Sequence, residues 1–442
     1  MLAQCQGTLQ RSSESRDSNG WHASAARRRQ CGRSAPDPTM NTPAPLTQHP
    51  PPHAPLGLVA IFGSTFFQLV GYFMLMPWLL LRLKDGGTAT AVAGLFVATG
   101  WLGVFLVTPF ASAITQRLGR RLSLWLAAGV PLLAMAGFVL SHSLWLWFAC
   151  ILLEGMAAGL RWVLAESVVA EFSSPQQRGR HVGLFETMVG TTFVVGPALL
   201  AWIGAQSDNA LWLAWALVGL GFAWSGLIPP IAPASDSETA HIGLFGVWHA
   251  LRLHPFVMAV GFVGGFFESG LTAILPLYGL SLGLGATAAA LLVSASGLGS
   301  ALMMLPAGML ADRMAHHPQQ RWGSAAQARW QLMRLCAWVT LLATLLIPWV
   351  VSTPWLAAPV AFLWGGAGGC LYTLAMIDIG SREQGITLVN STAVLVLSYT
   401  LGGVLAPALG AAALQWVPAL GFPLLLLAAA VLGCWLLRHP PR

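Results

Sequence analysis

Two short basic stretches decide the fold class of this chain. Residues 308–313 read GMLADR at the end of an apolar run over 286–311, and residues 117–121 read RLGRR just after an apolar run over 91–114. Both runs reach the length of a membrane-spanning helix, which needs about 20 apolar residues. Arginines gather at the cytoplasmic ends of such helices. The stretches therefore predict two spanning helices that end on the same side of a membrane.

The composition extends this prediction to the whole chain. Of its 442 residues, 56% are hydrophobic and 8% are charged, and the mean hydropathy is +0.68. Soluble proteins carry about 25% charged residues, so the composition excludes an ordinary soluble domain. The apolar segments are continuous rather than alternating, which excludes a membrane β-barrel. The chain is predicted to be an all-α polytopic membrane protein.

The net charge of +7 does not indicate a nucleic-acid partner, because the basic residues are not clustered on one surface. Six of the 22 lie in the polar stretch before the first apolar run, and most others flank apolar segments, where membrane topology places them. The six cysteines form no CxxC pair and the histidines show no ligand spacing. No metal site and no cofactor are predicted.

Residues 1–55 are expected to form a disordered polar N-terminal tail, since they are rich in Ser, Arg, Gln and Pro. No apolar segment follows the arginines as it does in a secretory signal. Met40 is an alternative start of translation.

Apolar runs separated by breakers predict twelve spanning helices. Outside the tail, thirteen arginines fall on one side of these helices, against only Arg82 and Lys84 on the other. The first side is predicted to be cytoplasmic, with both termini inside. The predicted spans are 57–81, 91–114, 122–140, 144–170, 182–205, 210–230, 255–280, 286–311, 331–351, 354–378, 386–411 and 419–437.

An internal repeat divides the spans into two sets of six. Gly155 and Pro197 of the first set match Gly365 and Pro407 of the second, at one offset of 210 residues (365 − 155 and 407 − 197). Such repeats are typical of transporters built from two related halves. The repeat predicts six-helix bundles over 56–230 and 255–442. The cytoplasmic linker over 231–254 is predicted to contain a short amphipathic helix on the membrane surface.

The two basic stretches, placed after the second and eighth spans, resemble the loop motif of the major facilitator superfamily, Gly-x-Leu-Ala-Asp-Arg-x-Gly-Arg-Arg. The copy at 308–313 matches its first part and the copy at 117–121 its last part, with Ser112 and Gln116 at the glycine and aspartate positions. The resemblance implies the major facilitator fold, in which two pseudo-symmetric six-helix bundles transport a small molecule by alternating access.

A closer likeness covers WVLAES at 162–167, RGR at 178–180, LYxxAM at 371–376 and LSYTLG at 397–402. These segments resemble the YcaD-type branch of bacterial facilitators. The chain departs from the family where many members carry a span-4 arginine, since that position is Ile151. The glycine-proline signature of span 5 is also partial. Both departures argue against the family's usual proton-antiport arrangement.

In the family, spans 1, 4, 7 and 10 line a central cavity. Glu268 lies in the middle of span 7, where apolar surroundings favour the protonated carboxyl, so we expect it to couple transport to protons. The alternative is that the polar residues buried in these spans only fix the packing of the helices. The candidates for the substrate or proton pathway are Gln68, Glu154, Arg161, Trp162, Glu268 and Tyr372.

A gate is expected at the cytoplasmic ends of the spans. Glu166, Glu186 and Asp378 are expected to pair with loop arginines, and Asp312 with an arginine or with the N-terminus of another helix. With Gln116 at the aspartate position, the first-half latch is expected to be the weaker one. The gate candidates are Arg117, Gly119, Arg120, Arg121, Glu166, Glu186, Gly308, Asp312, Arg313 and Asp378, and those for helix packing and hinges are Gly155, Gly159, Gly196, Pro197, Gly365, Gly369 and Pro407.

The function predicted from these features is secondary active transport in a bacterial inner membrane by a monomer surrounded by lipid. Proton-coupled export of a small amphipathic compound is expected first. Proton-coupled or facilitated import of a sugar, organic acid or other nutrient is the alternative. A membrane-embedded enzyme is a distant alternative, because no paired catalytic residues or HExxH motif occur.

Overall fold

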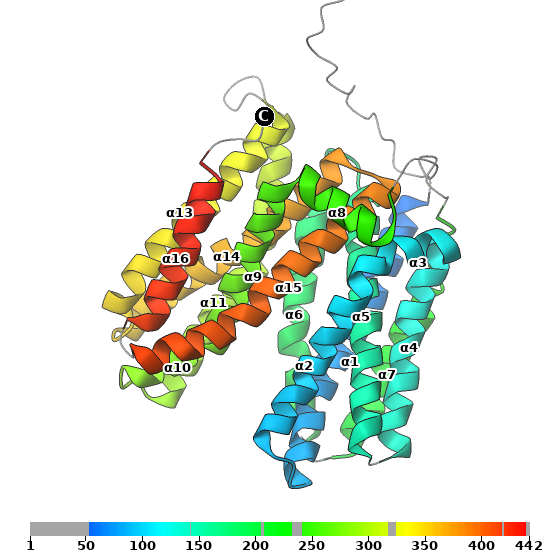
Figure 1. The fold of residues 1–442 in the computed structure, drawn as a ribbon, viewed down its shortest axis with the longest axis horizontal. Coiled ribbons are helices and arrows are strands. Elements are labelled where there is room, and N and C mark those ends of the chain that lie inside the picture. Colours follow the sequence, from blue (N-terminus) through cyan, green and yellow to red (C-terminus); the bar gives the residue numbers. More distant parts are fainter. Residues whose placement is uncertain are drawn as a thin grey trace, which may run out of the picture. The chain divides into compact units, whose positions relative to one another are not determined.

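The computed structural model describes residues 53–141, 143–204, 207–231, 241–316, 324–417 and 420–438. They all belong to one compact unit. Its secondary structure is helical, with no strand in the described residues (Figure 1). Residues 1–52 of the predicted tail and residues 232–240 of the predicted linker lie outside the described residues.

The first set of helices is continuous where the sequence is apolar and ends where glycine or polar residues interrupt it. The second predicted span is made of three consecutive pieces that together cross as one segment, Val92–Leu118. The elements are α1 Ala54–Asp85, α2 Thr90–Val107, η1 Thr108–Phe110, α3 Ala111–Leu118, α4 Arg120–Leu140, α5 Leu144–Phe172, α6 Arg178–Ile203 and α7 Asn209–Ser225.

The second set begins with a short helix, α8, which meets α9 at an angle of 96°. The predicted span over 255–280 is broken at Ile274, next to Pro276, whose backbone has no N–H to continue a helix. The elements are α8 Gly243–Leu253, α9 Pro255–Ala273, α10 Leu275–Ser281, α11 Ala286–His316, α13 Ala325–Val350, α14 Pro354–Arg382, α15 Gly385–Trp416 and α16 Gly421–Leu436.

Each of the twelve predicted spans coincides with one or more of these helices. In the described residues, nine segments are long and apolar enough to cross a membrane, and the bent pair α8–α9 adds a tenth. The helices α7 and α16 are apolar but shorter, with 17 and 16 residues. The prediction of an all-α polytopic membrane protein is confirmed.

The same helix pairings recur in the two sets. In the first, α5 packs on α2 and α4, and α6 on α1; in the second, α14 packs on α11 and α13, and α15 on α9. Glycines allow the closest approaches, because a Cβ at Gly155 would meet the backbone of Gly100, and one at Gly365 that of Ser296. Gly155 and Gly159 of α5 pack in this way against the region of α2, and Gly365 and Gly369 of α14 pack in this way against α11.

Two prolines sit at matching places inside α6 and α15. Pro197 follows Gly196, whose missing side chain lets α6 approach the backbone of α1 at Phe73 and Met74. Pro407 lies inside α15.

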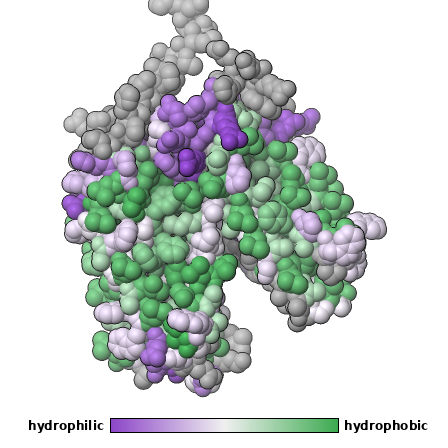
Figure 2. Space-filling model, turned by 180° about the vertical axis from the view of Figure 1, so that it is seen from behind, coloured by the Kyte–Doolittle hydropathy of each residue, from purple (hydrophilic) through white to green (hydrophobic). Residues whose placement is uncertain are grey.

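The two sets meet along α6 and α11 and along α5, α14 and α15. One end of the unit carries most of the arginines, and we call it the arginine-rich end. In Figure 2 hydrophilic side chains gather at that end, and an open notch separates the two lobes at the other end. The site that follows lies on the seam between the sets.

Candidate functional site

The seam begins at the arginine-rich end with a backbone-to-backbone contact between α6 and α11. A Cβ at Gly179 would meet the carbonyl oxygen of Gly308, and one at Gly308 would meet the carbonyl oxygen of Gly179. Further along, Gly183 lies against the backbone of Met304 and Leu305. No larger residue fits at Gly179 or Gly308 without moving the helices apart.

Asp312 fixes this contact. Its Oδ1 accepts a hydrogen bond from the backbone N–H of Gly179 at 2.7 Å, and its Oδ2 from that of Arg180 at 2.8 Å. These are N–H groups of the first turn of α6, which have no partner within their own helix. The sequence predicted that the partner of Asp312 is either an arginine or a helix N-terminus. In the structure the partner is the N-terminus of α6. We call this contact the Asp312 latch.

A second contact closes the seam on the α3 and α15 side. Glu171, at the end of α5, accepts a hydrogen bond from Arg120 at 2.6 Å and from the backbone N–H of Gly385 at 3.3 Å. Gly385 is the first residue of α15. We call this the Glu171 latch. Sequence reasoning missed Glu171, and the only signal was its position one residue before the end of α5.

Helix α8 bridges the same seam. The backbone N–H of Gly243 donates to the hydroxyl of Ser112 in α3 at 2.9 Å. The amide of Asn390 in α15 donates to the carbonyl of His241 at 2.7 Å. The start of α8 is therefore bonded to both sets of helices.

Another predicted gate residue, Asp378, is bonded within the second set rather than across the seam. Asp378 accepts from Arg329 at 3.0 Å and pairs with Arg382 at 2.9 Å, both from the second set. Arg121 stacks on the Trp125 ring. The remaining positions are Arg117 and Arg313, which are exposed, and Gly119, which ends α3 with a φ of 80°.

Within the first set, a buried polar group joins α1 and α5. Arg161 donates to the side chain of Gln68, whose amide reaches the carbonyl of Ala128 at 3.4 Å. Glu154 and Tyr72 interact electrostatically with Arg161. One carboxyl oxygen of Glu154 is buried without a hydrogen-bond partner. We call this the Arg161 group.

A different set of polar residues lies on the seam itself. Both carboxyl oxygens of Glu166, on α5, contact the hydroxyl of Tyr372, on α14, at 2.8 and 2.7 Å. The indole N–H of Trp162 also donates to Glu166. Glu186, on α6, lies close enough to Glu166 for the two carboxyls to interact electrostatically. Glu166 and Glu186 are both buried.

The expectation that Glu166 and Glu186 pair with loop arginines is therefore wrong. In the described part of the chain neither carboxyl forms an ion pair. Their helices carry them away from the arginine-rich end into the apolar middle of the seam, where the available donors are Tyr372 and Trp162.

Glu268 completes this arrangement from α9. Its carboxyl accepts a hydrogen bond from Tyr399 at 2.6 Å and from Ser300 at 3.3 Å. The ring centroids of Tyr399 and Tyr372 are 4.7 Å apart, and that of Trp162 is 5.7 Å from Tyr399. We call Trp162, Glu166, Glu186, Glu268, Ser300, Tyr372 and Tyr399 the seam cluster.

The predicted pathway residues thus separate into two places. Gln68, Glu154 and Arg161 belong to the Arg161 group, whereas Trp162, Glu268 and Tyr372 belong to the seam cluster. Sequence reasoning missed Ser300 and the role of Tyr399. A search for charged residues does not find hydroxyl donors. The LSYTLG segment did contain Tyr399, but only as a mark of resemblance.

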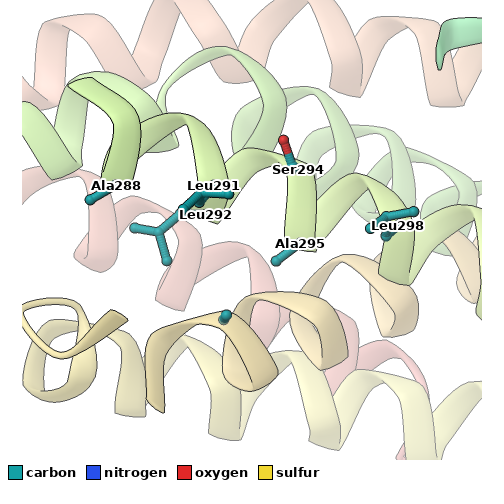
Figure 3. Close-up of a pocket in the computed structure, with 7 residues that line it drawn as sticks. Ala288, Leu291, Leu292, Ser294, Ala295 and Leu298 are labelled. Carbon is teal, nitrogen blue, oxygen red and sulfur yellow. The ribbon is translucent and has the colours of Figure 1, made fainter. Parts of the chain in front are cut away.

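A cavity of about 250 Å³ lies apart from the seam cluster, between α11 and the start of α14 (Figure 3). Its lining is aliphatic except for one hydroxyl residue, Ser294, and includes Ala288, Leu292 and Ala295. A lining of this kind offers little that recognises a polar ligand. No three metal-binding side chains converge among the residues described.

Sequence comparisons agree with this architecture. Residues 61–385 match the profile of the Major Facilitator Superfamily. The chain is 24% identical to "Uncharacterized MFS-type transporter YfkF" of Bacillus subtilis over 344 residues, which cover 76% of this chain and 83% of that one. It is 23% identical to "Uncharacterized MFS-type transporter YcaD" of Salmonella paratyphi A, with the same coverage.

Solved structures show the same fold. The human organic anion transporter MFSD10 superposes with a TM-score of 0.64 at 18% identity, covering 88% of this chain and all of the other. FucP, in the outward conformation, superposes with a TM-score of 0.68 at 13% identity, covering 88% and 99%. The chain belongs to the major facilitator superfamily of multi-pass membrane transporters, and it is similar to the YcaD-type branch.

Proposed function

We propose that the protein exchanges protons for a small amphipathic compound and so exports that compound across a bacterial inner membrane. The observation that carries the proposal is that the buried carboxyls of Glu166 and Glu186 lie close enough to interact electrostatically. Two carboxylates in such a place repel each other strongly, so the pair favours a state in which at least one of them holds a proton.

The position of this pair links the proton to movement. Glu166 contacts Tyr372 across the seam, so the pair lies where the two sets of helices must separate in alternating access. Loss of the proton leaves two negative charges in contact in apolar surroundings, which is strongly unfavourable. Such charges need hydration, which the closed seam at Tyr372 does not supply, so their formation favours separation of the two sets at this level. Proton occupancy thereby biases the equilibrium between the two states.

The direction of transport follows from exchange against protons that enter from outside. Basic residues predict that the arginine-rich end faces the cytoplasm, so the notch in Figure 2 faces outward. Protons from outside would reach the seam cluster in this state and would be released inside in the other. A compound that competes for the same carboxyls is carried the opposite way, which is export.

Proton flux in liposomes tests the proposal. The protein is reconstituted around a pH dye, and amphipathic cations, organic acids, amino acids and sugars are added in turn. We expect at least one amphipathic compound to drive protons out. Glu166→Gln and Glu186→Gln should abolish this flux, because the amide mimics a protonated acid that cannot release its proton. Asp85→Asn, at an exposed carboxylate at the end of α1, is the matched control.

The same assay can contradict the proposal. If both glutamine variants keep the full flux, the carboxyl pair does not carry the proton. Transport that ignores an imposed pH gradient would point to facilitated diffusion instead.

A further inference from the structure

The seam cluster has a buried part and a part that remains accessible. Glu166, Glu186 and Tyr372 are buried, whereas the side chains of Trp162, Glu268 and Tyr399 are partly exposed. Trp162 comes from α5 and Tyr399 from α15, in different sets of helices, and their rings are in contact. The partly exposed rings therefore lie where the two sets of helices meet.

This accessible part combines a carboxyl group with two aromatic rings. An organic cation is attracted by the negative charge of the carboxylate and by the electron-rich faces of indole and phenol rings. The other charged side chains of the cluster, Glu166 and Glu186, are also acidic. Arg161 donates to Gln68 and interacts electrostatically with Glu154 and Tyr72. An anion at Glu268 would therefore meet charge of its own sign.

We propose that Trp162, Glu268 and Tyr399 bind the cationic head of an amphipathic organic cation, and that this class is the transported substrate. The inference rests on the proposed exchange function and names its substrate. A cation and a proton then compete for the Glu268 carboxyl, so binding of one favours release of the other. The bulky apolar groups of such a cation suit a site whose walls are aromatic and aliphatic.

Other titratable groups face Glu268 and enter the same competition. Glu186 interacts with it electrostatically from α6, Tyr399 from α15 and Cys370 from α14. Glu166 and Tyr372 are the next groups outward, since Glu166 interacts with Glu186 and the Tyr372 ring lies against that of Tyr399. The acidic members load protons together as the pH falls, and the cation should be displaced over that range.

Equilibrium binding of two probes of equal shape and opposite charge tests the site. Tetraphenylphosphonium carries a permanent positive charge and cannot carry a proton, and tetraphenylborate is its negative counterpart. Binding of both to the purified full chain in detergent is measured at pH 8 and pH 6. We expect tetraphenylphosphonium to bind at pH 8 and to bind roughly tenfold more weakly at pH 6. Tetraphenylborate should bind far more weakly than tetraphenylphosphonium at both pH values.

Variants locate the site. Glu268→Gln keeps the size of the side chain and should weaken phosphonium binding about tenfold and remove its pH dependence. Trp162→Phe should weaken it about threefold. Trp145→Phe, at a tryptophan that is 86% exposed on the outer surface, and Asp85→Asn should leave binding unchanged. Unchanged binding by Glu268→Gln, or tighter binding of the borate, overturns the inference.

The two proposals fail separately. If the phosphonium does not bind but another class of compound drives proton flux in liposomes, the exchange function stands and the cation site is wrong. If the phosphonium binds at Glu268 and no compound drives proton flux, the cation site stands and the exchange function is wrong.

Discussion

The Asp312 latch and the Glu171 latch close two matching sides of the seam in different ways. Asp312 holds the N-terminus of α6 directly, through two short bonds to backbone N–H groups. Glu171 divides its carboxyl between Arg120 and the N-terminus of α15, and the backbone bond is longer, at 3.3 Å. Anions at helix N-termini are favoured by the helix dipole. The comparison indicates that the Asp312 latch contributes more of the free energy that favours the closed state than the Glu171 latch does.

The largest effect is expected from Gly308→Val. A side chain at this position would overlap the carbonyl of Gly179, so α6 and α11 cannot close at all. Spin labels at Gln176 and His316, both exposed at the arginine-rich end, report the separation. The short distance of the closed state should disappear. Retention of that distance would show that the glycine contact is dispensable.

Asp312→Asn should come next. The change keeps the shape of the side chain but removes its charge, so at most one of its two terminal groups can still accept a bond. Charge-assisted hydrogen bonds contribute about 2 kcal/mol, which corresponds to roughly 30-fold in the equilibrium between closed and open states. The same pair of labels should show a mixture dominated by the long distance. Asp85→Asn serves as the control for loss of a carboxylate elsewhere.

Glu171→Gln is expected to have a smaller effect. The amide oxygen can still accept a hydrogen bond from Arg120 or Gly385. The site is partly exposed, so solvent screens the charge and its removal costs less free energy. We expect about 1 kcal/mol, or roughly fivefold, toward the open state. An effect as large as that of Asp312→Asn would remove the asymmetry between the latches.

Gln116→Asp sharpens the comparison from the opposite direction. It restores the aspartate that the family motif carries on α3, next to α15. An added carboxylate near the start of α15 should favour the closed state by about 0.5 kcal/mol. In combination with Glu171→Gln it should recover much of the closed population. No recovery would mean that residue 116 does not reach the α15 terminus.

The sequence predicted the helices, the family and Asp312 as a gate residue held by an arginine or a helix N-terminus, because hydropathy and the helix dipole act locally. It misplaced the partners of Glu166, since position along a helix shows depth in the membrane but not which neighbouring helix the side chain faces. Ser300 and Tyr399 could not be found, because their roles arise only where α11 and α15 meet α9. The break at Ile274 was also missed, although Pro276 marked it.

Only one partner in the Asp312 latch, the Asp312 side chain itself, carries a charge that a mutation can change. Its partners are main-chain N–H groups, which every residue except proline supplies, and Gly179 is closed to larger side chains by Gly308. A genetic screen for suppressors of Asp312→Asn should therefore yield no charge swap on α6. Compensating changes should arise instead in the Glu171 latch, or where α8 is bonded to Ser112 and Asn390.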